Sequence, residues 1–212
     1  MNEKKISSDK VIGVLLAGGL ARRMGGGDKC LRSLAGRPLL DHLIDAVKPQ
    51  VDLMILNANG EAARFASYGL SVVADVIEGY AGPLAGVLTG LEWTAENVPD
   101  ATWVASLATD APFLPGDLVA RMKSAIKIEG ADMACAASGG RVHPVFGLWP
   151  IGLRGDLRAA MIEENIRKID LWTARYNLVV VEFEEEQGRD PFFNVNQPEN
   201  LVEAGRIIAG PG

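Results

Sequence analysis

Short apolar runs alternate along this chain with longer segments in which apolar residues recur every three or four positions. The runs have the length of β-strands, and several are almost continuously apolar, as in parallel strands covered on both faces. They occupy residues 11–16, 51–56, 70–74, 102–107, 133–137 and 178–183. The segments with helical spacing occupy residues 39–47, 84–94, 116–128, 153–163 and 198–208.

This alternation predicts an α/β fold of three layers, αβα, in which helices cover both faces of a mostly parallel central sheet. The regular order changes after Arg141, where residues 142–150 predict an extra strand and residues 184–192 a charged surface loop. Residues 1–9 are polar and predict a flexible tail. The remaining residues, 10–212, are predicted to form a single domain.

Composition and charge exclude several classes of protein. The chain has 212 residues, of which 48% are hydrophobic, so a sizeable core is expected. Its net charge of −6 argues against nucleic-acid binding, which needs a basic surface. No stretch approaches the roughly 20 apolar residues that cross a membrane. Two distant cysteines, Cys30 and Cys135, are too few for a disulfide scaffold and suit a reducing compartment, so we predict a cytoplasmic location.

The loop that follows the first apolar run is rich in glycine and basic residues. Five glycines fall within residues 18–27, and Arg22, Arg23 and Lys29 are placed among or after them. Glycines allow successive backbone N–H groups to surround a phosphate, whose oxygens Arg and Lys also bind. A flexible loop with solvated basic residues is the alternative, but the position after a buried strand favours anion binding. Neither the P-loop pattern nor the dinucleotide fingerprint fits this loop.

Residues 16–29 read L-A-G-G-x-x-x-R-M-G-x-x-D-K, which resembles the signature loop of the molybdenum cofactor guanylyltransferases. These enzymes belong to the Rossmann-like nucleotidyltransferases. Sugar-activating relatives usually carry proline where this chain has Asp28. Cytidylyltransferases of the same cofactor typically read Leu-Ala-Ala-Gly, whereas residues 16–19 here read Leu-Ala-Gly-Gly. The resemblance therefore favours GTP as the nucleotide.

Polar residues follow the next two predicted strands. Asn57 and Asn59 stand two positions apart, so in an extended chain they face the same way. Asn side chains read base or ribose edges, but they also favour turns. Asp75 could accept from guanine N–H groups or start a turn, and Gly82-Pro83 could begin a helix. In the family that the loop resembles, the positions of Asn57 and Asp75 contact the nucleotide.

Two further polar segments lie later in the chain. Asp110 follows the predicted strand 102–107, where a carboxylate suits Mg²⁺ or a helix cap. Asn194 and Asn196 precede a predicted helix and face the same way. The resemblance implies that Asp110 binds the metal and that Asn194 and Asn196 contact the acceptor or the metal. His143 is expected to be structural.

The resemblance implies transfer of GMP from GTP to molybdenum-molybdopterin, with Mg²⁺ as cofactor and release of pyrophosphate. Arg23, Lys29 and Asp110 are the implied catalytic residues, and Asp110 holds the metal. The implied nucleotide-binding residues are Leu16, Ala17, Gly18, Gly19, Lys29, Asn57, Asp75 and Asp110. We expect residues 10–115 to bind the nucleotide and 116–212 the acceptor. The resemblance also suggests other cofactor-biosynthesis proteins and apo-molybdoenzymes as partners, and we expect neither nucleic acid nor a membrane as a partner.

Two other functions stay open at this point. One is a related nucleotidyltransferase, either a molybdopterin cytidylyltransferase that uses CTP or an enzyme whose acceptor is a sugar phosphate. The other is a GTP-binding adaptor, without catalysis, that delivers the cofactor. The joint presence of Arg23, Lys29 and Asp110 argues against the adaptor, because binding alone does not require a metal carboxylate.

Overall fold

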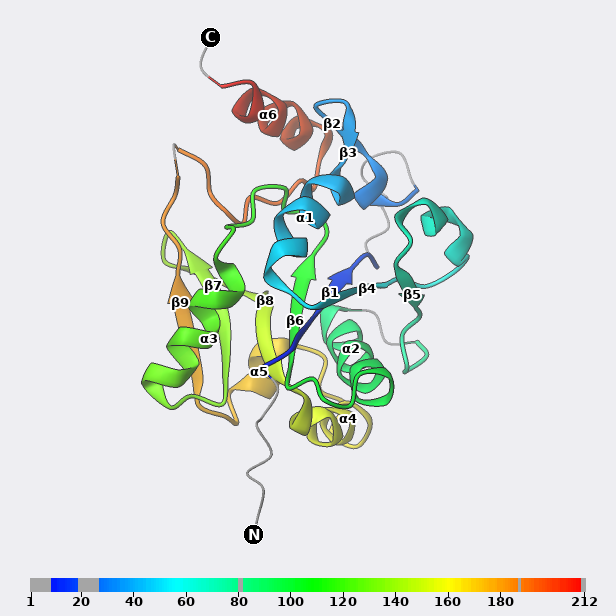
Figure 1. Cartoon of the computed structure of the whole chain (residues 1–212), viewed down its shortest axis with the longest axis vertical. Helices are drawn as coiled ribbons and strands as arrows, with labels where there is room; N and C mark the ends of the chain where they lie inside the picture. The colour runs from blue at the N-terminus through cyan, green and yellow to red at the C-terminus, as the bar shows by residue number, and fades with distance from the viewer. Residues whose placement is uncertain (1–8, 19–26, 80–81, 187, 211–212) are drawn as a thin grey trace.

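Seven strands form the central sheet of the computed structural model, which describes residues 9–18, 27–79, 82–186 and 188–210. They are β1 (Val11–Leu16), β4 (Leu53–Asn57), β5 (Ser71–Val73), β6 (Trp103–Ala108), β7 (Met133–Ser138), β8 (Arg141–Pro150) and β9 (Leu178–Glu182). Their order across the sheet is β5-β4-β1-β6-β8-β7-β9 (Figure 1). β8 alone runs antiparallel to its neighbours, β6 and β7. The carboxyl ends of the other strands therefore meet at one edge of the sheet.

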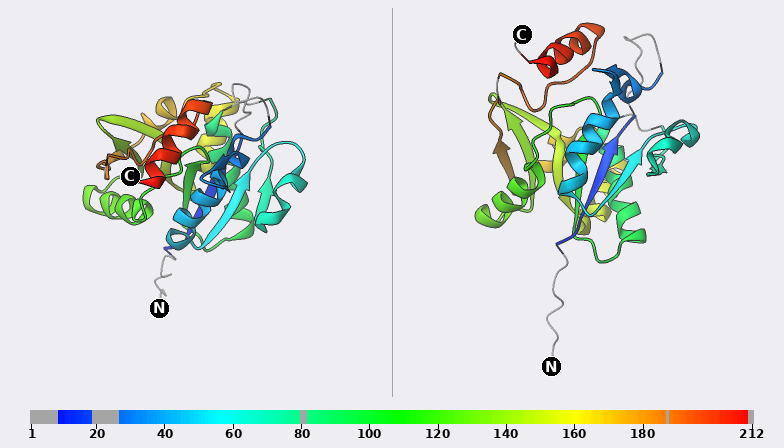
Figure 2. Two further views of the ribbon diagram at one scale, coloured as in Figure 1. Left: turned by 90° about the horizontal axis from the view of Figure 1, so that it is seen from above. Right: turned by 45° about the horizontal axis from the view of Figure 1, so that its top comes forward.

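Helices cover both faces of this sheet, which confirms the predicted three-layer α/β fold (Figure 1, Figure 2). On one face lie α1 (Leu39–Val47) and α3 (Leu118–Glu129), which contribute to the first hydrophobic cluster. On the other lie α2 (Pro83–Asn97), α4 (Arg154–Ile162) and α5 (Ile169–Thr173), which contribute to the second. The space between the helices and the sheet is filled on each face by apolar side chains, many of them from the predicted strands.

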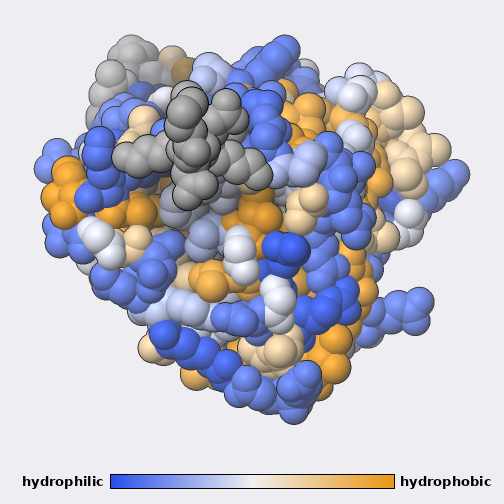
Figure 3. Space-filling view, turned by 60° about the horizontal axis from the view of Figure 1, so that its bottom comes forward, coloured by the Kyte–Doolittle hydropathy of each residue, from blue (hydrophilic) through white to orange (hydrophobic). Residues whose placement is uncertain are grey.

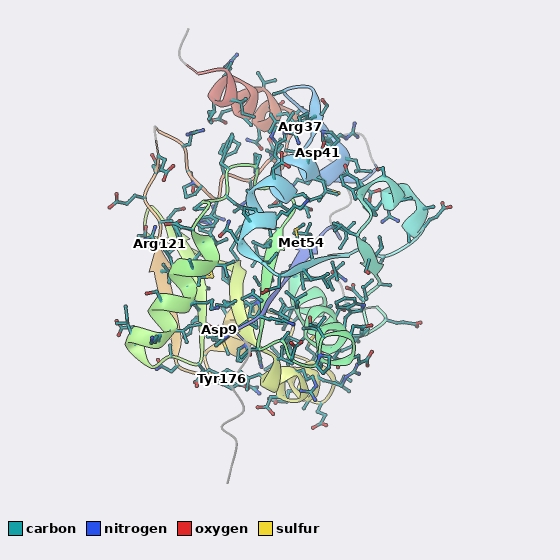
Figure 4. All side chains as sticks on the ribbon, in the orientation of Figure 1. Asp9, Arg37, Asp41, Met54, Arg121 and Tyr176 are labelled. Carbon is teal, nitrogen blue, oxygen red and sulfur yellow. The ribbon has the colours of Figure 1, made fainter. Side chains whose placement is uncertain are left out.

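Short elements lie between the main strands and helices. The 3₁₀ helices are η2 (Lys29–Leu31), η3 (Lys48–Gln50), η4 (Ala62–Tyr68) and η5 (Ile151–Leu153). β2 (Ser33–Leu34) and β3 (Arg37–Pro38) form a separate antiparallel ribbon before α1. Figure 4 shows Arg37 beside Asp41 of α1, and their charged groups lie 3.7 Å apart. The last helix, α6 (Pro198–Ala209), packs against this ribbon through a small apolar cluster that includes Leu34 and Ala204.

The close approach of α2 to the sheet depends on two glycines. A Cβ atom at Gly90 would overlap the side chain of Val14, and one at Gly86 would overlap the side chains of Leu16 and Asn57. The helix therefore begins directly beside the ends of β1 and β4. Gly82 precedes α2 with φ of 137°, a conformation that residues with a side chain rarely adopt.

The surface at the other end of the sheet is mixed in character. Figure 3, in which the lower end of Figure 1 comes forward, shows hydrophilic residues over much of this face, with hydrophobic ones between them. Within the described part of the chain, no helix has both the length and the apolar character needed to span a bilayer. The candidate site lies at the opposite end of the sheet from the face in Figure 3, at the carboxyl ends of the parallel strands.

Candidate functional site

A cavity of about 810 Å³ opens at the carboxyl ends of β1, β4, β5 and β6. This is where open α/β sheets bind their ligands, and the volume is typical of a small-molecule site. Five of the residues predicted for the nucleotide line it: Leu16, Gly18, Asn57, Asp75 and Asp110. Asn59, Gly82 and Pro83 also contribute to the wall. Topology thus brings together side chains from four separate strand ends.

Asp75 is held on one wall of the cavity by two asparagines. Its Oδ1 accepts a hydrogen bond from Asn57 Nδ2 at 2.9 Å, and its Oδ2 accepts one from Asn59 Nδ2 at 2.8 Å. Asn59 Oδ1 in turn accepts from the Asp75 backbone N–H at 2.8 Å. Each carboxylate oxygen keeps a lone pair for a ligand. Asn59 was not among the predicted site residues, and its spacing of two from Asn57 is the signal that could have identified it.

Lys29, Asp110 and Asn196 meet although they come from three distant segments. Lys29 Nζ lies 2.5 Å from Asp110 Oδ2 and also donates to Asn196 Oδ1. The backbone N–H of Val195 donates to the Asp110 carbonyl at 2.8 Å, which ties the segment before α6 to the end of β6. The lysine and aspartate side chains are 13% and 21% exposed, so a ligand can still reach them. Within the described residues, no hydrogen bond joins Asn194 to this group.

The second oxygen of Asp110 suits a metal ion. Oδ1 of Asp110 is buried and has no hydrogen-bond partner among the described residues, which is the state of an oxygen that can ligate a cation. No group of three or more His, Cys, Asp or Glu side chains surrounds it in that part of the chain. One carboxylate that leaves the other positions to water and phosphate oxygens is a donor set that fits a divalent cation.

The start of the glycine loop is anchored by the neighbouring strands. The Leu16 carbonyl accepts a hydrogen bond from Thr109 Oγ1 at 3.0 Å, and the Ala17 N–H donates to the Asn57 carbonyl at 2.9 Å. Two predicted residues, Gly19 and Arg23, lie outside the described residues. Their positions are therefore not part of this geometry.

Cys30, next to Lys29, is not a reactive thiol. Burial, with a smaller contribution from the charge of Asp28, raises its pKa to about 12. Its side chain is 1% exposed and belongs to the first hydrophobic cluster. The protonated thiol therefore packs in this cluster, and it offers no nucleophile.

His143 is buried on β8 in a small polar network. Its Nε2 lies 2.9 Å from Ser138 Oγ, and that hydroxyl donates to Asp190 Oδ1 at 2.7 Å. Because the hydroxyl hydrogen is used, Nε2 of neutral His143 must donate to the serine rather than accept from it. The ring packs 4.9 Å from that of Phe192, and burial lowers the pKa of His143. These contacts favour a packing role and leave Ser138 without a general base.

The three-layer fold, the cavity at the carboxyl ends of its strands and the family match together define the class of the protein, an α/β nucleotidyltransferase. The chain belongs to the MobA-like NTP transferase domain family, which it matches over residues 13–176. It is 56% identical to the molybdenum cofactor guanylyltransferase of Bradyrhizobium sp. (strain ORS 278), covering 94% of this chain and 93% of the relative. The enzyme of the same name from Mesorhizobium japonicum is 44% identical, covering 93% and 96% of the two chains.

Solved structures of low sequence identity share the fold. The crystal structure of molybdopterin-guanine dinucleotide biosynthesis protein A from Archaeoglobus fulgidus superposes with a TM-score of 0.73. It is 23% identical, and the match covers 94% of this chain and all of the other. At this identity the likeness bears on the architecture, and the predicted Rossmann-like nucleotidyltransferase fold is confirmed.

Proposed function

We propose that this protein transfers GMP from GTP to molybdenum-molybdopterin, forming the molybdopterin guanine dinucleotide and releasing pyrophosphate. The observation that carries the proposal is that one cavity is lined both by Asp75, which Asn57 and Asn59 hold in place, and by Asp110, which is paired with Lys29. The first suits a base with two N–H donors, and the second suits a polyphosphate with its metal. The curated relatives with this activity, which match nearly the whole chain, support it.

Recognition of guanine is assigned to the Asp75 carboxylate. The Watson–Crick edge of guanine carries two neighbouring donors, N1–H and the 2-amino group, which match two carboxylate oxygens. Cytosine offers one amino donor beside an acceptor nitrogen, which a carboxylate repels. Asn57 and Asn59 hold the carboxylate plane in place before the base arrives, which lowers the ordering cost of binding.

Charge neutralisation at the phosphates is assigned to Lys29 and Arg23. The ammonium of Lys29, held by Asp110 and Asn196, is placed to stabilise the charge that develops as pyrophosphate departs. Backbone groups of residues 16–19 approach the phosphates closely in the same proposal. The acceptor phosphate is itself a nucleophile, so these residues need only orient the reactants, and no general base is required.

The metal in this proposal is Mg²⁺, held by Asp110. Bound there it would neutralise phosphate charge and align the two reacting groups. Asn196 shares the Lys29 ammonium with Asp110, which supports it as a second ligand or an acceptor contact. Asn194 is retained only as an acceptor contact.

The acceptor and the protein partners complete the proposal. We assign molybdopterin to the part of the chain formed by residues 116–212, and the nucleotide to residues 10–115. Delivery of the product to apo-molybdoenzymes, with other cofactor-biosynthesis proteins, would take place in the cytoplasm. Two free, buried cysteines, Cys30 and Cys135, support a reducing compartment.

Pyrophosphate release tests the proposal against its alternatives. Purified protein with Mg²⁺, GTP and molybdopterin is expected to release one pyrophosphate per dinucleotide formed, as measured by a coupled phosphate assay and chromatography. Parallel reactions contain CTP, or a sugar phosphate as acceptor. Binding of GTP without pyrophosphate would indicate the adaptor, and faster turnover with CTP would indicate the cytidylyltransferase.

Nucleotide preference provides a direct prediction for Asp75. GTP is expected to bind more tightly than CTP, and Asp75→Asn is expected to weaken GTP binding by about 10- to 100-fold, as for loss of a hydrogen bond to a charged group. Calorimetry of both nucleotides measures the change. CTP affinity serves as the internal control, because CTP does not use the carboxylate in this way. Equal losses for GTP and CTP would contradict a role in base recognition.

A further inference from the structure

Arg64 of η4 makes contacts that extend into two segments of the candidate site. Its Nε lies 2.7 Å from Asp28 Oδ2, and its Nη2 donates to the Asn59 carbonyl at 2.7 Å. Nη1 donates to the carbonyl of Glu61. The guanidinium carbon lies 4.6 Å from the centre of the Phe65 ring, which is completely buried. One side chain thus joins two loops and rests on the core.

Each of the two loops carries a residue of the proposed mechanism. Asp28 immediately precedes Lys29, and the two begin the same short helical turn, η2. Asn59 holds both the carboxylate and the backbone N–H of Asp75. The side chains of Arg64 and Asp28 are 26% and 16% exposed, so their ion pair is partly shielded from solvent. A displacement of Arg64 would therefore be expected to move both Lys29, through Asp28, and Asp75, through Asn59.

We infer that Arg64 is a positioning residue, which sets the distance between the phosphate-binding lysine and the base-binding aspartate. This inference rests on the roles proposed for Lys29 and Asp75. The guanidinium charge is already paired with Asp28 and two carbonyl groups, so Arg64 is not assigned to the phosphates. A planar fork with several donors is needed for these contacts, and the single point charge of a lysine cannot reproduce them.

Arg64 has two arms, the ion pair with Asp28 and the hydrogen bond to the Asn59 carbonyl, and the loss of each is expected to have a different kinetic effect. The arm to Asp28 acts on Lys29, and misplacement of a catalytic group by about 1 Å can cost on the order of 100-fold in rate. The arm to the Asn59 carbonyl supports the asparagine that holds Asp75, so its loss is expected to change the KM for GTP. Arg64→Met, which removes both arms, is expected to lower kcat by about 10- to 100-fold and to raise the KM for GTP. Asp28→Asn, which weakens one arm, is expected to lower kcat with little change in KM.

The test compares kcat and KM in Arg64→Met, Arg64→Lys, Asp28→Asn and the double variant Asp28→Asn/Arg64→Met. Arg64→Lys is expected to recover part of kcat, because it keeps a charge for Asp28, while KM for GTP stays high. The double variant is expected to match Arg64→Met in kcat, because both changes break one contact. Arg158→Met is the matched control, since it removes an equally close pair with Glu92, at 2.6 and 2.7 Å, between α4 and α2. It is expected to leave both constants unchanged.

Thermal unfolding of every variant separates positioning from loss of fold. If Arg64→Met does not fold, Arg64→Lys and Asp28→Asn carry the same comparison. Wild-type kcat and KM in folded Arg64 variants would overturn the inference, as would losses that multiply in the double variant. Lys29→Ala separates this inference from the proposed function. Wild-type turnover in Lys29→Ala refutes the role of the lysine, whereas an inactive Lys29→Ala beside a fully active Arg64→Met refutes the role of Arg64 alone.

Discussion

Replacement of Lys29 by alanine is expected to lower kcat by about 100- to 1,000-fold, the usual effect of removing one preorganised group that stabilises transition-state charge. Lys29 Nζ is held 2.5 Å from Asp110, and this contact fixes the ammonium before the substrate binds. The change leaves Asp110 without its cation, but the aspartate side chain is 21% exposed and can be hydrated. The loss of stability should therefore be about 1–2 kcal/mol, well below that of a fully buried pair.

Steady-state kinetics of pyrophosphate release and thermal unfolding, measured on the same preparations, distinguish the two effects. Lys127→Ala is the control, because Lys127 is an exposed lysine in the last turn of α3. It is expected to match the wild-type protein in both measurements. Turnover of Lys29→Ala at the wild-type rate would remove this lysine from the mechanism.

Asp110→Asn is expected to remove the Mg²⁺-dependent reaction, with a loss of at least about 1,000-fold in kcat/KM. A metal that stabilises transition-state charge contributes several kcal/mol, and each 1.36 kcal/mol corresponds to a factor of ten in rate. The buried Oδ1 of Asp110, which accepts no hydrogen bond within the described residues, belongs to the carboxylate proposed as the metal ligand, and this change removes the charge of that carboxylate. Because the change also breaks the ion pair with Lys29, a loss of stability of about 1–2 kcal/mol is expected, as for Lys29→Ala.

Titration of turnover with Mg²⁺, together with calorimetry of Mn²⁺ in the presence of GTP, measures this loss independently of the folding signal. Asp117→Asn is the matched control, since Asp117 is an exposed aspartate in the loop after the same strand. Its Mg²⁺ dependence should equal that of the wild-type protein. An Asp110→Asn variant whose turnover keeps the wild-type dependence on Mg²⁺ would show that the metal is held elsewhere.

Most of the secondary structure could be predicted because it depends on local patterns. The strand Val11–Leu16 and the helix Leu39–Val47 were predicted with the bounds that the structure has. The strand predicted at 51–56 begins instead at Leu53, because Asp52 turns to exchange hydrogen bonds with Val11. The short helix α5 was missed, since five residues are too few to show a helical period.

Local sequence patterns were enough to predict the strands, the flanking helices and the polar residues at the strand ends, because apolar periodicity and glycine content act over a few neighbouring positions. The sequence by itself identified Asp75 and Asp110 as candidates through their place after two apolar runs. Only the tertiary structure brought Lys29 to Asp110, 81 residues away, and to Asn196, 167 residues away. It alone showed that Arg64 links Asp28 to Asn59. Such contacts depend on strand order and loop packing, and neither leaves a periodic signal in the chain.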